Sequence, residues 1–203
     1  MEVNEAELNY SKKKYTVEEY REMESTSEVK HEYYQGEIFA MAGATVPHNF
    51  VKKNIISALD QKLNDSPCQP HNGDTRIYIK KNGMHMYPDV TVICGEVQTD
   101  NNDKFNVLNP TIILEVLSPS TEGYDKGLKF SFYREIPTLR EYILVEPESL
   151  RIEAFHLNGD GFWGLKVYKD IDDTLELTSI SVSLPLKEIY KRTEVTDQLD
   201  NKK

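Results

Sequence analysis

The hydrophobic pattern is strongest in residues 111–135, which read TIILEVLSPSTEGYDKGLKFSFYRE. The β-branched and aliphatic run at 112–117 has the length of a strand and predicts one that is buried on both faces. Glu115 interrupts this run, and a carboxylate in an apolar strand is costly unless it is paired, hydrogen-bonded or bound to a metal. Residues 118–121 (SPST) end the strand and offer hydroxyl caps for a following helix. The chain thus carries an acid that needs an explanation just ahead of a helix.

Two short elements are predicted near the start of the chain. Residues 16–24 have the pattern of a helix that begins with a capping box, in which Thr16 is followed three residues later by Glu19. Residues 30–41 predict two short strands around Gln35-Gly36, a hairpin with Glu37 at its turn.

A longer amphipathic helix is predicted to open at Pro47, because proline is tolerated in the first helical turn. The apolar residues that recur with helical period after it are Val51, Ile55, Ala58, Leu59 and Leu63. Residues 75–81 and 86–94 then predict two strands joined by Asn82-Gly83, which is a strong hairpin turn signal. Residues 95–109 are polar and predict a loop.

Beyond the central stretch, Pro137 ends the helix and residues 141–145 (EYILV) predict another buried strand. An antiparallel extension and a short closing helix follow, in residues 151–157, 162–169, 174–177 and 184–190. The predicted fold class is therefore α/β, with a mixed central sheet, core helices and an antiparallel C-terminal extension.

Length and composition predict one domain. The 203 residues, of which 38% are hydrophobic, suffice for a single core, and no repeat or linker divides the chain. We expect residues 1–14 to be a disordered tail, 15–190 to form the domain, and 191–203 to be a polar tail. No apolar run has the length of a membrane span, and the start MEVNEAELNY does not resemble a signal peptide, so a soluble, cytoplasmic protein without a membrane partner is expected.

Cysteine content and net charge restrict the chemistry further. Cys68 and Cys94 are too few for a disulfide framework, so we expect reduced thiols. The net charge of −10 argues against binding polyanions over the whole surface, although a nucleic-acid enzyme can confine its basic groups to one cleft.

A second acid, Asp89, begins the strand at 89–93. If this strand lies beside the one that carries Glu115, both carboxylates reach a common point near one edge of the sheet. Two carboxylates with a few waters suit Mg²⁺, which dehydrates reluctantly. A nearby lysine could then stabilise charge developing on a phosphate or orient the attacking water.

The helix after Glu115 offers that lysine. Asp125, Lys129 and Tyr133 recur at four-residue spacing and line one stripe. The apolar positions with the same spacing are Tyr124, Leu128 and Phe132. At about 100° per residue they predict a buried face centred near Leu128, with Lys129 on its shoulder. The same geometry directs Lys126 to solvent and Phe130 to the outside.

Plain alternatives exist for these signals. A Pro-Asp dipeptide also marks the turn into a strand, and Asp125 with Lys129 could be a surface ion pair. A zinc site is a further alternative, for which the candidate ligands are Cys68, His71, His85 and Cys94. The spacing of the last two does not form a second zinc knuckle.

The order of these elements resembles the core of the PD-(D/E)XK nuclease superfamily and, more closely, the Uma-type restriction endonuclease family. The matching segments are YTVEEY (15–20), EYYQGEIFAMAGATVPH (32–48), YPDVTVI (87–93), ILEVLSPST (113–121), DKGLKFSFY (125–133) and EYILVEP (141–147). The resemblance covers roughly residues 15–190. It implies a restriction-endonuclease-like α-β-β-β-α-β core, with Asp89, Glu115 and the Val116 carbonyl binding Mg²⁺ or Mn²⁺.

One position departs from the superfamily pattern. The lysine that normally lies two residues after the glutamate is replaced by Leu117, so the resemblance implies a lysine supplied by the helix, and Lys129 fits. Glu37 and His48 also fall in the matching segments and could support the site, as could Asp125 and Tyr133. Glu37 could equally belong only to a hairpin, and His48 could be a helix-terminal histidine bonded to backbone.

The resulting hypothesis is a divalent-metal-dependent endonuclease acting on nucleic acid, with DNA as the expected partner. A homodimer would suit cleavage of both strands of a duplex. The alternative is a catalytically inactive interaction module that keeps the nuclease fold, which the acidic net charge favours.

Overall fold

The computed structural model describes residues 13–41, 43–101, 103–119 and 121–196. Its central sheet has the strand order β12-β11-β10-β9-β6-β3. The bounds are β3 Cys68–Asn72, β6 Val90–Cys94, β9 Ile112–Val116, β10 Glu141–Val145, β11 Ile152–Leu157 and β12 Trp163–Tyr168. Strands β9 and β10 are parallel and the other neighbours are antiparallel, so the sheet is mixed as predicted.

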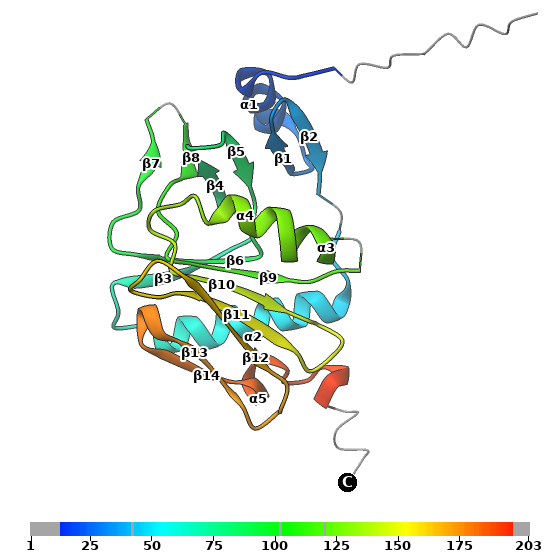
Figure 1. Cartoon of the computed structure of the whole chain (residues 1–203). Coiled ribbons are helices and arrows are strands. Elements are labelled where there is room, and N and C mark those ends of the chain that lie inside the picture. Colours follow the sequence, from blue (N-terminus) through cyan, green and yellow to red (C-terminus); the bar gives the residue numbers. More distant parts are fainter. Residues whose placement is uncertain (1–12, 42, 102, 120, 197–203) are drawn as a thin grey trace, which may run out of the picture.

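A second sheet forms the upper part of the molecule in Figure 1, with the order β2-β1-β5-β4-β8-β7. Its strands are β1 His31–Tyr34, β2 Glu37–Ala40, β4 Arg76–Ile79, β5 Met84–Met86, β7 Thr99–Asp100 and β8 Asp103–Val107. A small sheet pairs β13 (Thr174–Leu177) with β14 (Val182–Pro185).

Helices lie on both faces of the central sheet, α2 on one and the segment from α3 to α4 on the other, while α1 lies beside β1 of the second sheet (Figure 1). The helical elements are α1 Val17–Thr26, α2 Val46–Lys62, α3 Glu122–Tyr124, a π-helical turn Asp125–Lys129, α4 Phe130–Tyr133, α5 Leu186–Ile189 and a 3-10 turn Thr178–Ile180. On one face, α2 packs through Val51 and Ile55 into a core that includes Val92 and Leu114. On the other face, the segment from α3 to α4 closes a separate core that also contains side chains of the second sheet.

The predicted α-β-β-β-α-β order is present, but partly through other strands. The core order is α2, β3, β6, β9, α4 and β10, with β4–β5 and β7–β8 inserted between members of the central sheet. The strand predicted at 75–81 lies in the second sheet. The strand predicted at 86–94 is interrupted around Pro88, because proline donates no ladder hydrogen bond. The predicted loop at 95–109 contains β7 and β8.

The helix after β9 differs from the prediction in its phase. Leu128, placed at the centre of the buried face, is 52% exposed, whereas Phe130, placed outside, is only 8% exposed. The cause is the π-helical turn, since a wider turn of i→i+5 bonding rotates the following residues relative to an ideal α-helix. Phe130 therefore stacks on Tyr142 of β10, with ring centroids 4.8 Å apart.

The expectation of two reduced thiols is wrong. Cys68 on β3 and Cys94 on β6 are direct partners in the antiparallel register, and they form a disulfide. Cysteine count and spacing do not reveal this, because only the strand register brings the two side chains together.

Several local predictions are confirmed. The capping box between Thr16 and Glu19 has both of its hydrogen bonds. The hairpin turns at Gln35-Gly36, where Gln35 has a φ of +48° and Gly36 a φ of +84°, a value that glycine adopts without strain. The antiparallel extension is β11 and β12, while the predicted closing helix at 184–190 is the end of β14 followed by α5.

The ends of the chain are only partly described. Residues 1–12 of the expected disordered tail and 197–203 of the expected polar tail lie outside the described residues. Val195 is 4% exposed and belongs to the core, so packing continues beyond residue 190. Within the described ranges, none of the helices has the length and apolar character to span a membrane.

Candidate active site

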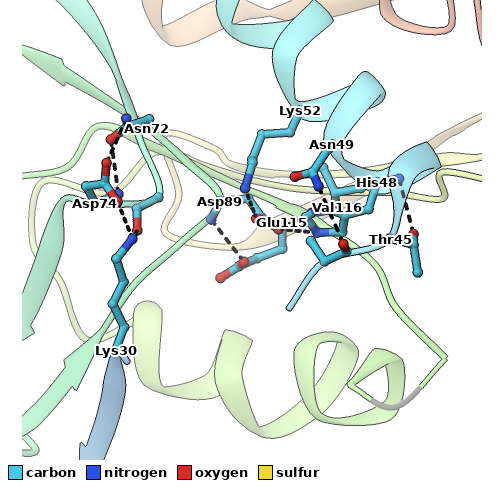
Figure 2. Close-up of polar contacts among 12 residues, drawn as sticks. Lys30, Thr45, His48, Asn49, Lys52, Asn72, Asp74, Asp89, Glu115 and Val116 are labelled. Carbon is cyan, nitrogen blue, oxygen red and sulfur yellow. Dashed lines mark hydrogen bonds and ion pairs between the residues drawn. The ribbon is translucent and has the colours of Figure 1, made fainter. Parts of the chain in front are cut away.

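Asp89 lies just before β6, at the end of the central sheet where β9 also ends. Its Oδ2 accepts hydrogen bonds from the Val116 backbone N–H (2.9 Å) and from His48 Nε2 (3.1 Å). Lys52 Nζ lies 3.3 Å from Oδ1. Figure 2 shows His48 and Lys52 extending from α2 towards Asp89. The carboxylate is thus held between the sheet and the first turns of α2.

Glu115 is the fourth residue of β9 and is 4% exposed. The backbone N–H of Asp89 points to its Oε2 at 3.3 Å, so the two acids are adjacent, as the sequence predicts (Figure 2). Its Oε1 accepts from the hydroxyl of Tyr133 (3.1 Å) and lies 2.9 Å from Lys129 Nζ. These partners of the buried acid come from Asp89 and from the helical segment that follows β9.

Lys129 is 6% exposed and lies among three carboxylates. Besides Glu115, its Nζ is 3.4 Å from Asp125 Oδ1 and 3.4 Å from Glu32 Oε1. Lys126, by contrast, pairs with three acids outside this cluster, which are Glu122, Glu146 and Glu153. The structure therefore brings Lys129, and not Lys126, to Glu115.

A pocket of about 1150 Å³ opens onto these residues. Asp89, Glu115, Asp125 and Lys129 line it, and so do residues of the β1–β2 hairpin and the first turns of α2. The buried acids thus face a space that a substrate group can enter.

The environment of the two acids shifts their pKa values in opposite directions. Burial raises the pKa of Glu115 to about 8; Lys129 opposes this, while Asp125 and Asp89 add to it. Burial acts to raise the pKa of Asp89 too, but the His48 and Val116 hydrogen bonds and Lys52 outweigh it, so its pKa is lowered. Asp89 is therefore the more readily ionised acid, whereas burial of Glu115 outweighs the stabilisation of its charge by Lys129.

The side chains that line the pocket include more acidic than basic groups, and a bound cation would offset the excess negative charge. The described lining residues include six carboxylates (Glu28, Glu32, Asp74, Asp89, Glu115 and Asp125) and three lysines (Lys30, Lys52 and Lys129). Two adjacent carboxylate side chains beside an open pocket fit Mg²⁺ or Mn²⁺, which keep several water ligands. In the part of the chain that the structure describes, there is no cluster of three or more His, Cys, Asp or Glu able to hold a metal.

The other predicted residues are placed as follows. His48 lies in the first turn of α2 and bonds to Asp89 through its side chain, while its backbone N–H donates to Thr45. Val116 ends β9 and contacts Asp89 through its N–H. Glu37 begins β2 and pairs with Lys14 at 3.1 Å, and it does not line the pocket.

Two residues of the cluster were not found from the sequence. Lys52 follows His48 by one helical turn, so the i, i+4 spacing could have indicated it once His48 was considered. Glu32 lies on the β1–β2 hairpin, and no local pattern connects it to Lys129. The zinc alternative lacks its ligands, because Cys68 and Cys94 are joined in the disulfide.

The fold is a nuclease-like α/β fold. A solved structure described as a putative nuclease belonging to DUF820, from Anabaena variabilis, superposes with a TM-score of 0.71 over 86% of this chain and 97% of its own, at 14% sequence identity. This likeness concerns the fold.

The family follows from sequence. The model of the Uma2 family, described as "putative restriction endonuclease", matches residues 17–187, and the chain belongs to this family. Two uncharacterised proteins of Synechocystis sp. are similar. The protein slr1290 is 36% identical over 178 residues, which is 88% of this chain and 92% of the relative. The protein sll1609 is 38% identical over 148 residues, or 73% and 84%.

Proposed function

We propose that this protein is a divalent-metal-dependent endonuclease that hydrolyses phosphodiester bonds of nucleic acid, with DNA as the first substrate to test. The observation that carries the proposal is the meeting of Asp89 and Glu115, from two neighbouring strands, beside a pocket of about 1150 Å³. The family description and the nuclease-like fold support it.

The residues that would hold Mg²⁺ or Mn²⁺ are Asp89 and Glu115, and the Val116 carbonyl is proposed as a further ligand. A bound divalent cation supplies charge stabilisation at the phosphate and activation of water. The protein does the positioning: Lys129 and Tyr133 fix the Glu115 carboxylate, and the Val116 N–H fixes Asp89.

The two lysines beside these acids have different roles. Lys129 is enclosed by carboxylates, so its function is to orient Glu115 and to offset its charge. The side chain of Lys52 is 26% exposed, lines the pocket and ends at Asp89, which places its ammonium group where it can meet a phosphate oxygen.

Purified protein with Mn²⁺ should nick supercoiled plasmid or cut single-stranded circular DNA, and EDTA should stop it. Asp89→Asn and Glu115→Gln should each abolish cleavage and weaken Mn²⁺ binding measured by calorimetry. The matched control is Glu37→Gln, which removes a carboxylate outside the pocket and should leave both unchanged. Cleavage that survives Asp89→Asn identifies a contaminant, and the lack of cleavage on DNA and RNA favours the inactive interaction module.

A further inference from the structure

We infer that the ligand of this pocket is single-stranded nucleic acid, one base of which stacks on Phe39 at the pocket rim. The inference deepens the proposed function and relies on it for the position of the reacting phosphate.

The depth of the acids is the first observation. Glu115 and Lys129 are 4% and 6% exposed, and they line the wall of the pocket. A flexible single strand can bend its backbone into the pocket and insert a whole nucleotide, whereas a base-paired nucleotide can do so only by leaving its stack, which costs a few kcal/mol.

The charges around the pocket are the second observation. Duplex DNA is bound chiefly by cations that neutralise its phosphates. Here each described lining lysine already faces a carboxylate: Lys30 is paired with Asp74, Lys52 with Asp89, and Lys129 with Glu115. With twice as many carboxylates as lysines along the lining, the pocket offers little neutralisation of the phosphates of any nucleic acid, so stacking of an unpaired base has to contribute much of the affinity.

The apolar rim is the third observation. Phe39 on β2 is 48% exposed, and Leu128 is 52% exposed on another side of the same pocket. Tyr34 and Phe132 also line it but pack against each other, with ring centroids 4.6 Å apart. Phe39, with 48% of its surface exposed, can instead offer a ring face to a ligand. A base stacked on an aromatic side chain is stabilised whatever its identity, which is how proteins hold single strands.

The hairpin register connects this ring to the acids. Phe39 is the direct partner of Glu32 in the β1–β2 ladder, and directly opposed side chains project from the same face. Glu32 in turn contacts Lys129. A strand whose base rests on Phe39 is thereby led towards Glu115, which contacts the same lysine.

Fluorescence anisotropy with the full chain tests the inference. The probes are a fluorescein-labelled 15-nucleotide DNA strand, the RNA of the same sequence and the blunt DNA duplex, with Ca²⁺ in place of Mg²⁺. We expect at least one single strand to bind at least ten-fold more tightly than the duplex. Phe39→Ala should weaken that binding about ten-fold or more, and Phe39→Trp should retain it. Phe105→Ala, which removes a 79% exposed ring on β8, should change nothing.

Equal or tighter binding of the duplex overturns the inference, and so does wild-type affinity of Phe39→Ala for the single strands. The cleavage assay with Mn²⁺ separates the two proposals. If cleavage requires Asp89 but prefers duplex, the endonuclease proposal holds and the inference of a single-stranded ligand is wrong. If single strands bind in a way that depends on Phe39 but no probe is cleaved, the endonuclease proposal is wrong and the inference of a single-stranded ligand holds.

Discussion

Lys129 Nζ lies 2.9 Å from Glu115 Oε1, so the helix that follows β9 returns its lysine to the strand it has just left. The same ammonium group contacts Asp125 and Glu32, which makes it the centre of a buried acidic cluster. Removing it would leave three carboxylates without their shared cation, and an uncompensated buried charge is strongly destabilising.

We predict that Lys129→Met lowers the free energy of unfolding by about 3–5 kcal/mol. Lys126→Met is the matched control in the same turn. It should cost less than about 1 kcal/mol, because its ion pairs are more exposed. Urea unfolding measures both. If the Glu115 carboxylate binds metal, Mg²⁺ should stabilise Lys129→Met more than wild type, since it supplies the missing positive charge. Equal losses in the two variants would contradict the placement of Lys129.

The sequence correctly predicts that Lys129, and not Lys126, lies beside Glu115, although the geometric reason behind that prediction is wrong. An α-helical period places the buried face at Leu128, whereas the π-helical turn exposes Leu128 and buries Phe130. A π-turn depends on packing against the sheet, so no propensity in DKGLK reveals it. The spacing of Asp125, Lys129 and Tyr133 was sufficient, because these three side chains stay together in either helix type.

The meeting of Asp89 and Glu115 could be predicted because each acid has a local signal, one after Pro88 and the other inside an apolar strand. Glu32 and the disulfide had no such signal. Both depend on which strands pair and in which register, and that is decided by the packing of the whole sheet. The division of residues 75–107 between two sheets was missed for the same reason.

We predict that reduction of the Cys68–Cys94 disulfide lowers the free energy of unfolding by about 3 kcal/mol, because it closes a loop with a sequence separation of 26. Urea unfolding with and without dithiothreitol measures the difference. The double variant Cys68→Ser/Cys94→Ser should be insensitive to dithiothreitol and match the reduced protein. Two thiols that react in the denatured, unreduced protein would show that the bond is absent.

His85 makes the stability depend on pH. Its ring is fully buried and stacks on Tyr78, and its Nδ1 is 2.9 Å from Asn106 Oδ1. Burial lowers the pKa of His85 to about 4; the Asn106 bond opposes this and Arg76 adds to it. The unfolded chain therefore takes up a proton near pH 6.5 that the folded chain does not, and stability is lost as the pH falls from about 6.5 to 4.

The expected loss over that range is about 3 kcal/mol, and it should be absent from His85→Gln, whose side chain does not titrate. Urea unfolding of both proteins at several pH values between 4 and 7 gives the difference between their free energies of unfolding. The contributions of the other titrating groups cancel in this difference. Parallel pH profiles for the two proteins would show that His85 has the same proton affinity in the folded and unfolded states.

Lys52 is predicted to be the lysine that meets the substrate. It lies 3.3 Å from Asp89 and keeps a 26% exposed side chain at the pocket, whereas the side chain of Lys129 is 8% exposed and surrounded by acids. If the protein cleaves nucleic acid, Lys52→Gln should lower kcat about 10²–10³-fold, the usual effect of losing a group that stabilises transition-state charge.

Lys53→Gln, one position further on α2 and exposed, is the matched control. Thermal unfolding should place both variants near wild type, because an ion pair this close to solvent contributes little to stability. Loss of kcat in Lys129→Arg with normal turnover in Lys52→Gln would return the role to Lys129.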